Sequence, residues 1–169
     1  MRTRYTIRDQ GGTHFITCTV VKWLPIFTRK PYFDILLDSL RYCRQHKGLK
    51  LYAYVMLDNH LHLVASGDQL TDIIRDFKSY TAKALIPQLE QEQKTWVLNQ
   101  LRYYKQPTKT RSDYQVWQEG FHPQQKLSLR RCCIRKSITC ITTRCVPEWW
   151  SSPRIGFIPA PGIMLGRRV

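Results

Sequence analysis

The sequence predicts an α+β domain in which two helices pack against an antiparallel sheet. Segments rich in β-branched and apolar residues, typical of strands, alternate with two longer segments in which apolar residues recur every three or four positions, as on one face of a helix. The predicted order of elements is β-α-β-β-α-β. The 169 residues, of which 43% are hydrophobic, suffice for one domain with a real core and leave little for a second.

The first half of the chain supplies a strand, a helix and a second strand. Residues 14–21 (HFITCTVV) are β-branched and apolar, which predicts a strand. Residues 31–46 carry apolar side chains at helical spacing, where Pro31 suits the first turn of a helix and Gly48 suits its end. Residues 51–57 (LYAYVML) predict the second strand.

The next elements form a hairpin strand and a long helix. Asp58 and Asn59 are turn residues, and the following residues 60–66 (HLHLVAS) alternate polar and apolar side chains as a half-buried strand does. Apolar residues at helical spacing then predict a helix from Gln69 to Gln91.

The last part of the domain is predicted to return to the sheet. Residues 92–113 contain strand-like apolar residues followed by a polar stretch, and residues 114–121 (YQVWQEGF) predict the final strand. Two right-handed crossovers around an antiparallel sheet give a ferredoxin-like sandwich. We expect this domain to occupy residues 1–125 and residues 126–169 to form an aberrant, irregular C-terminal tail.

The formal charge of +15 indicates a polyanionic partner, with nucleic acid ahead of an anionic membrane surface. Residues 1–125 hold 18 basic and 11 acidic residues, a net +7, whereas residues 126–169 hold 9 basic and 1 acidic residue, a net +8. The sequence contains no run of about 18 apolar residues, so no transmembrane helix is expected. The N-terminus lacks the apolar region of a secretory signal. A cytoplasmic, nucleoid-associated protein is expected.

The tail differs from the rest of the chain in its cysteines as well. It holds four of the six cysteines, namely Cys132, Cys133, Cys140 and Cys145. A basic zinc-binding tail is one interpretation, but no C-x2-C pair occurs and the tail contains no histidine. A disulfide scaffold is less favoured still without a secretory signal.

The histidine pair in residues 54–66 (YVMLDNHLHLVAS) is the most informative feature of the sequence. His60 and His62 lie two apart on a predicted strand, so both imidazoles project from one face while Leu61 points into the core. This arrangement suits two ligands of one divalent metal. The alternative is a pair of surface histidines on a solvated strand.

The surrounding residues resemble a known family. An apolar strand, an Asn turn and His-Leu-His-Leu resemble the signature of HUH endonucleases, in particular the REP-associated, single-tyrosine transposases (IS200-like). Residues 14–27, 73–85 and 116–124 resemble the family's first strand, second helix and fourth strand, and the resemblance spans residues 5–125. The family commonly has Pro where this chain has Asp58. The family fold is the ferredoxin-like sandwich that the element order predicts independently.

The resemblance implies a DNA transposase that nicks and joins single-stranded DNA at hairpin-forming repeats. A tyrosine attacks the scissile phosphate to give a 5′-phosphotyrosine, and Mg²⁺ or Mn²⁺ held by His60 and His62 polarises the phosphoryl oxygen. In the family the tyrosine belongs to a C-terminal Tyr-x-x-x-Asn-Pro helix whose Asn completes the metal site. This chain has no tyrosine after Tyr114 and no asparagine after Asn99, so no catalytic tyrosine is assigned and inactivity is expected.

A frameshift near residues 125–126 accounts for the missing helix. When codons are rebuilt from the third base of one residue and the first two bases of the next, residues 131–151 permit the reading MLHQKVDYMHYNPVRAGMVV, which contains the Tyr-x-x-x-Asn-Pro pattern. The tyrosine is encoded across Ile138 and Thr139, and the asparagine across Thr142 and Thr143. The tail is therefore interpreted as a product of the wrong reading frame.

Basic and aromatic residues in two other segments are candidates for DNA contact. The predicted second helix carries Arg75, Lys78, Tyr80 and Lys83. The alternative for the three cations is an ordinary solvated helix face. Tyr80 could also substitute as the nucleophile, but a packing or DNA-contact role is favoured. Tyr103, Tyr104 and Lys105 could stack unpaired bases beside a charge, although strand packing is favoured. His122 could approach the metal, with a structural histidine as the default.

A non-enzymatic, basic nucleic-acid-binding protein is the rival hypothesis. Loss of Mn²⁺ affinity in His60→Ala favours the transposase, and metal-independent, strongly salt-dependent binding favours the rival. The family includes both dimers and monomers, so a homodimer is one expectation and a monomer the other.

Overall fold

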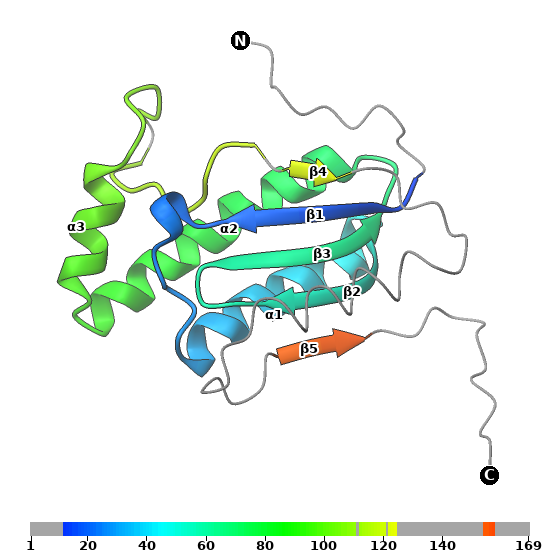
Figure 1. Ribbon diagram of the computed structural model, residues 1–169, viewed down its shortest axis with the longest axis horizontal. Helices are drawn as coiled ribbons and strands as arrows, with labels where there is room; N and C mark the ends of the chain where they lie inside the picture. The colour runs from blue at the N-terminus through cyan, green and yellow to red at the C-terminus, as the bar shows by residue number, and fades with distance from the viewer. Residues whose placement is uncertain (1–11, 111, 121, 125–153, 158–169) are drawn as a thin grey trace.

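The computed structural model describes residues 12–110, 112–120, 122–124 and 154–157, the last two ranges through their backbone alone. These residues form a sheet with helices packed against it (Figure 1). In chain order the elements are β1 (His14–Thr19), the 3-10 turn η1 (Val21–Trp23), α1 (Lys30–His46), β2 (Lys50–Met56), β3 (His60–Ser66), α2 (Leu70–Gln91), α3 (Thr95–Tyr103), β4 (His122–Gln124) and β5 (Arg154–Phe157).

The strands form one sheet in the order β4-β1-β3-β2-β5, and each neighbouring pair is antiparallel. Helices α1 and α2 connect non-adjacent strands and lie together behind the sheet in Figure 1. The order β4-β1-β3-β2 with both of these helices on one face is the ferredoxin-like arrangement. The predicted α+β fold class is therefore confirmed, and the predicted bounds of α1 and α2 agree with the structure to within one residue.

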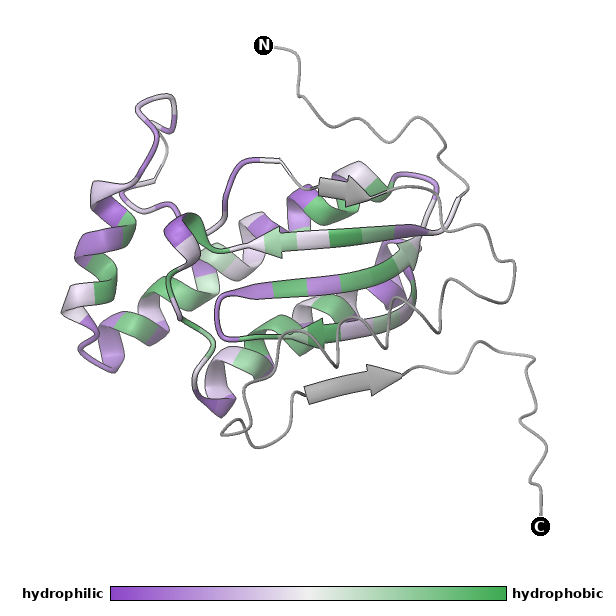
Figure 2. Ribbon diagram, in the orientation of Figure 1, coloured by the Kyte–Doolittle hydropathy of each residue, from purple (hydrophilic) through white to green (hydrophobic). Residues whose placement is uncertain are grey.

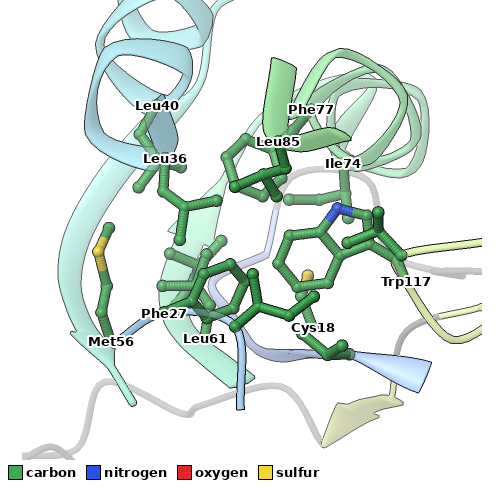
Figure 3. Close-up of a cluster of buried hydrophobic side chains, with 14 of the residues drawn as sticks. Cys18, Phe27, Leu36, Leu40, Met56, Leu61, Ile74, Phe77, Leu85 and Trp117 are labelled. Atoms are coloured by element: carbon green, nitrogen blue, oxygen red, sulfur yellow. The ribbon is translucent and has the colours of Figure 1, made fainter. Parts of the chain in front are cut away.

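The core lies between the sheet and the two helices. Alternate strand residues point into it, and Ile16, Cys18, Leu61 and Leu63 are each 0% exposed. Figure 3 shows Phe77 of α2 on the same side of the sheet as Cys18 and Leu61, together with Leu36 and Leu40 of α1. The first half of β3 alternates hydrophilic and hydrophobic residues in Figure 2. The prediction that Leu61 points into the core is confirmed.

The end of α1 shows why its C-terminal boundary could be predicted. The amide N–H of Lys47 still bonds back to the carbonyl of Cys43, and so does that of Leu49. Gly48 between them has φ 70°, the left-handed conformation that closes many helices and that other residues adopt at a cost. The chain then enters β2 directly, which places β2 beside β3 and fixes the hairpin that carries the histidines.

Residues 92–113 contain a helix rather than strand-like structure. The prediction of strand-like structure was wrong because Trp, Val and Tyr are frequent in strands. The buried residues Leu98 and Leu101 lie three apart, as on one helix face. Tyr103 therefore ends a helix, and it is 80% exposed instead of packed in a strand.

The final strand begins later than predicted. Within residues 114–121 the ladder is limited, among the described residues, to a bridge between Trp117 and Val20, and β4 covers His122–Gln124. Gly120 has φ 71°, which interrupts the extended backbone, and the ammonium of Lys78 binds the carbonyls of Gln118 and Gly120. These carbonyls are thus satisfied by a side chain and not by a neighbouring strand.

A buried hydroxyl connects α2 to this segment. Thr81 donates to the carbonyl of Phe77 at 2.8 Å and accepts from Nε1 of Trp117 at 3.0 Å. Replacing Thr81 with the isosteric valine leaves the buried indole N–H unpaired, so we expect a loss of about 1–3 kcal/mol of unfolding free energy. Urea titration measures it, with Thr81→Ser, which keeps the hydroxyl, as the control. Equal stability of the two variants would contradict this role.

The tail contributes a strand that the sequence did not predict. β5 (Arg154–Phe157) pairs antiparallel with β2, from Ala53 opposite Phe157 to Met56 opposite Arg154. Its four residues lie between Pro153 and Pro159, which cannot donate to a strand ladder. The four cysteines of the tail lie outside the described residues. So do residues 138–139 and 142–143, whose codons would encode the missing tyrosine and asparagine in the other frame.

Candidate metal centre

His60 and His62 lie at the start of β3, directly after the turn that joins it to β2. Residues 58 and 59 form the bend, and the amide of Leu57 bonds to the carbonyl of His60 at 2.9 Å, which closes the hairpin. Leu61 between them is fully buried under the helices, so the two imidazoles project from the opposite face. Their ring centres are 4.6 Å apart with the planes at 81°. The prediction that both histidines share one face is confirmed.

A backbone carbonyl fixes the tautomer of His60 through Asn59. Nδ2 of Asn59 donates to the carbonyl oxygen of Trp23 at 3.2 Å, and Oδ1 of Asn59 lies 2.6 Å from Nδ1 of His60. Because a carbonyl oxygen can only accept, the amide must present Nδ2 to Trp23 and Oδ1 to the imidazole. Nδ1 of His60 must then carry the proton, which leaves the lone pair of Nε2 available.

His62 is held in the same manner by the neighbouring strand. Thr17 is its cross-strand partner on β1, and Oγ1 of Thr17 lies 2.9 Å from Nδ1 of His62. The ring of Phe15 stacks on the imidazole with centres 5.1 Å apart. If Nδ1–H donates to the threonine hydroxyl, Nε2 of His62 keeps its lone pair as well. Within the part of the chain that the structure describes, neither Nε2 atom has a hydrogen-bond partner.

The pKa shifts of both histidines favour the neutral imidazole. Burial, together with the nearby His60, lowers the pKa of His62 from its usual 6.5 to about 4. Burial also lowers the pKa of His60, and the charge of Asp58 opposes this shift. A histidine must be unprotonated to bind a metal ion, so the two side chains are already in the binding form.

The spacing of the two rings meets one requirement of a shared metal ion. Two imidazoles that share one ion through bonds of about 2.1 Å have ring centres roughly 4.5 to 5.5 Å apart, and the pair in this structure meets that condition. Among the described residues, no group of three His, Cys, Asp or Glu side chains could hold an ion. Thr17 pairs with His62 on one side and with His122 of β4 on the other, which puts position 122 in the same cross-strand row.

The residues proposed to contact DNA on α2 lie away from the histidines. The buried side of α2 packs on the same sheet face as Leu61, so its outer side is separated from His60 by the sheet and the core. Tyr80 and Lys83 are exposed there, and Arg75 pairs with Asp72 at 2.8 Å. The structure does not bring these residues and the histidines together.

Among these α2 residues, Lys78 has a structural role. Its ammonium binds two backbone carbonyls, those of Gln118 and Gly120, and burial lowers its pKa. These bonds engage the charge that a phosphate contact would need.

Three residues that contact the histidine pair, or hold a residue that does, were not predicted from the sequence: Thr17, Trp23 and Asn59. Lys22 and Trp23 have φ angles of 52° and 57°, left-handed values that cost non-glycine residues about 1–3 kcal/mol each. This turn aims the Trp23 carbonyl at Asn59 and brings the indole to 5.4 Å from the His60 ring. A run of two left-handed residues has no signature in residue type, whereas Asn beside His was visible but was interpreted as a turn.

No family model matches this sequence, and no curated protein does. The solved structures that are similar to it include the following two. One is a REP-associated tyrosine transposase bound to a REP hairpin, with 16% identity, a TM-score of 0.49 and coverage of 75% of this chain. The present chain spans 64% of that protein. The other is a Deinococcus radiodurans R1 protein assigned to the transposases, with 19% identity, a TM-score of 0.44 and coverage of 83% of this chain and 97% of that one.

The helices in the described ranges fall short of what a bilayer requires. None of them is long and apolar enough to cross one.

Proposed function

We propose that this chain is a REP-associated, single-tyrosine HUH transposase whose C-terminal part is read in the wrong frame. The observation that carries the proposal is the pair of imidazoles on the face of β3 that points away from α1 and α2. Nδ1 of His62 lies within hydrogen-bond distance of Thr17, and Nδ1 of His60 lies within hydrogen-bond distance of Asn59. Together with the motif in residues 54–66, this pair supports a divalent metal site of the kind that HUH enzymes use. The substrate in this proposal is single-stranded or hairpin DNA.

In such a site, different residues of the chain would have different roles. His60 and His62 hold the ion, while Asn59 and Thr17 fix the orientation of their rings. A bound Mg²⁺ or Mn²⁺ would polarise the scissile phosphoryl oxygen. A tyrosine oxygen would bond to phosphorus as the P–O3′ bond breaks, which leaves a 3′-hydroxyl and a 5′-phosphotyrosine.

This chain lacks the attacking group in its present frame. Its last tyrosine is Tyr114, whose hydroxyl accepts a hydrogen bond from Arg102 at 2.9 Å. We therefore propose that the chain binds metal and DNA but does not nick. A homodimer and a cytoplasmic, nucleoid-associated location remain parts of the proposal.

Restoring the reading frame tests this function. A chain rebuilt with the alternative frame from residue 126 is expected to form a covalent adduct with a hairpin oligonucleotide in the presence of Mn²⁺, whereas the present chain forms none. A gel under denaturing conditions separates the adduct. The control is His62→Ala in the rebuilt chain, which should abolish the adduct through loss of a metal ligand.

Each arm of that experiment can contradict a different part of the proposal. An adduct from the present chain would refute its inactivity, and no adduct from a folded rebuilt chain would refute the transposase function. Sequencing of the locus tests the frameshift separately, since an in-frame read with unrelated codons removes that explanation.

The non-enzymatic alternative is favoured by one observation. The described residues supply two imidazoles but no third His, Cys, Asp or Glu ligand beside them. Calorimetric titration with Mn²⁺ separates the two hypotheses: affinity that disappears in His60→Ala supports the metal-dependent function, and nucleic-acid binding that depends on salt but not on metal supports the alternative.

A further inference from the structure

A series of contacts connects the histidine pair with the C-terminal end of α3. The indole of Trp23 meets the His60 ring edge-on, with ring centres 5.4 Å apart. The ammonium of the adjacent Lys22 lies over the ring of Tyr104, 5.2 Å from its centre. Tyr104 in turn contacts Tyr103, with ring centres 5.0 Å apart. Figure 1 shows η1, which carries Trp23, between the sheet and α3.

The two ends of this path expose aromatic rings to solvent. Trp23 is 57% exposed and Tyr103 is 80% exposed. Large apolar side chains that a folded domain leaves in water mark interaction surfaces when they gather along one path. Trp96 adds a third ring, 60% exposed and seven residues before Tyr103 on α3, which places both on the same helix face.

The charge of this path is positive. Residues 93–110 contain four basic residues and no acidic one, namely Lys94, Arg102, Lys105 and Lys109. Lys109 is partly neutralised by Glu119, at 3.6 Å. Arg102 lies over the ring of Tyr114 and donates to its hydroxyl, which holds the guanidinium at that ring.

We propose that this path, defined by Trp23, Lys22, Tyr104 and Tyr103, binds the unpaired DNA strand that leads to the histidine pair. Exposed rings beside cations are the arrangement that binds single strands, because bases stack on the rings while the cations attract phosphates. A duplex hides the faces of its bases, so the aromatic rings select an unpaired strand. The proposal rests on the proposed function for its substrate, but it involves none of the metal ligands as contacts.

The backbone of the turn supports a specific role for Trp23. Two successive left-handed residues are strained, and hydrogen bonds from both sides hold them: the amide of Val21 bonds to the carbonyl of Val116, and that of Trp23 to the carbonyl of Val20. A strained conformation that its surroundings enforce is typical of binding and catalytic sites. Here it presents an indole to solvent directly beside His60.

Fluorescence anisotropy with the full chain tests the inference. The probe is a labelled oligothymidine of about twelve nucleotides, titrated in EDTA so that no metal contributes. Trp23→Ala and Tyr103→Ala are each expected to weaken binding by about five- to hundredfold, while Trp23→Phe retains most of the affinity because it keeps a stacking ring. The matched control is Tyr42→Ala, which removes a ring 54% exposed on α1, outside the path.

The outcomes distinguish this inference from the proposed function. Wild-type binding that Trp23→Ala and Tyr103→Ala leave unchanged overturns the inference, as does an equal loss in Tyr42→Ala or no binding by the folded wild-type chain. Binding to anionic vesicles in place of the oligothymidine also overturns it. Loss of Mn²⁺ affinity in His62→Ala is measured separately, so either result can fail while the other holds.

Discussion

Replacing Phe77 with alanine is expected to lower the unfolding free energy of the domain by about 3–5 kcal/mol. The ring is 1% exposed, and it packs against Trp117 with ring centres 6.2 Å apart. Figure 3 shows it between α2 and the sheet. Its removal forfeits apolar burial and leaves a cavity where the second crossover helix meets the strands. Since domains are stable by only about 5–15 kcal/mol, this single change takes a large share.

Urea unfolding followed by circular dichroism measures the effect on Phe77→Ala. Tyr80→Ala is the matched control, because it removes a ring from the same helix at a site 61% exposed and should change stability by about 0.5 kcal/mol or less. Equal midpoints for the two variants would show that α2 does not pack on the sheet as described.

Replacing Asn59 with leucine is expected to release the tautomer of His60 and to weaken Mn²⁺ binding by about 10- to 100-fold. The amide is the link between the Trp23 carbonyl and Nδ1 of the imidazole. Without it, the proton is free to move to Nε2, and the nitrogen proposed as the metal ligand loses its lone pair in that form. The effect needs no change in the ligands themselves.

Two measurements check the role of Asn59. Long-range ¹H–¹⁵N correlation spectra of the metal-free protein report which ring nitrogen of His60 carries the proton, and calorimetry reports the Mn²⁺ affinity. Asn59→Asp keeps an acceptor oxygen and should retain the tautomer, while Asn99→Leu, on the exposed side of α3, should change neither quantity. An Nε2–H tautomer in the wild-type protein would refute the assignment.

Local patterns predicted the part of the fold that carries the histidines. The alternation in residues 60–66 identified a strand with Leu61 inside, and the structure places β3 at His60–Ser66. The same patterns failed for residues 95–103, because strand-forming residue types masked two buried leucines at helical spacing. In this nine-residue segment the residue types favoured a strand, and the helical repeat was too short to outweigh them.

The site was predictable only as far as side-chain alternation reaches. The separation of α2 from the histidines follows from the alternation of side chains along β3, since a helix that packs on Leu61 cannot also approach His60 from the other face. The role of Thr17 needed the strand register that sets it opposite His62, and the role of Trp23 needed left-handed φ angles. Neither register across β1 nor positive φ at a tryptophan can be derived from residue types alone.

The pairing of β5 with β2 has a consequence for the association of this chain with other copies of itself. Main-chain amides and carbonyls form a ladder without regard to side chains, so a segment that selection never shaped can still close an open sheet edge. An uncovered β2 would offer its backbone to other copies of the chain and invite fibrous association. If the tail arose by the proposed frameshift, four residues that were not selected for this role would thus cover part of the β2 edge and reduce aggregation of the chain.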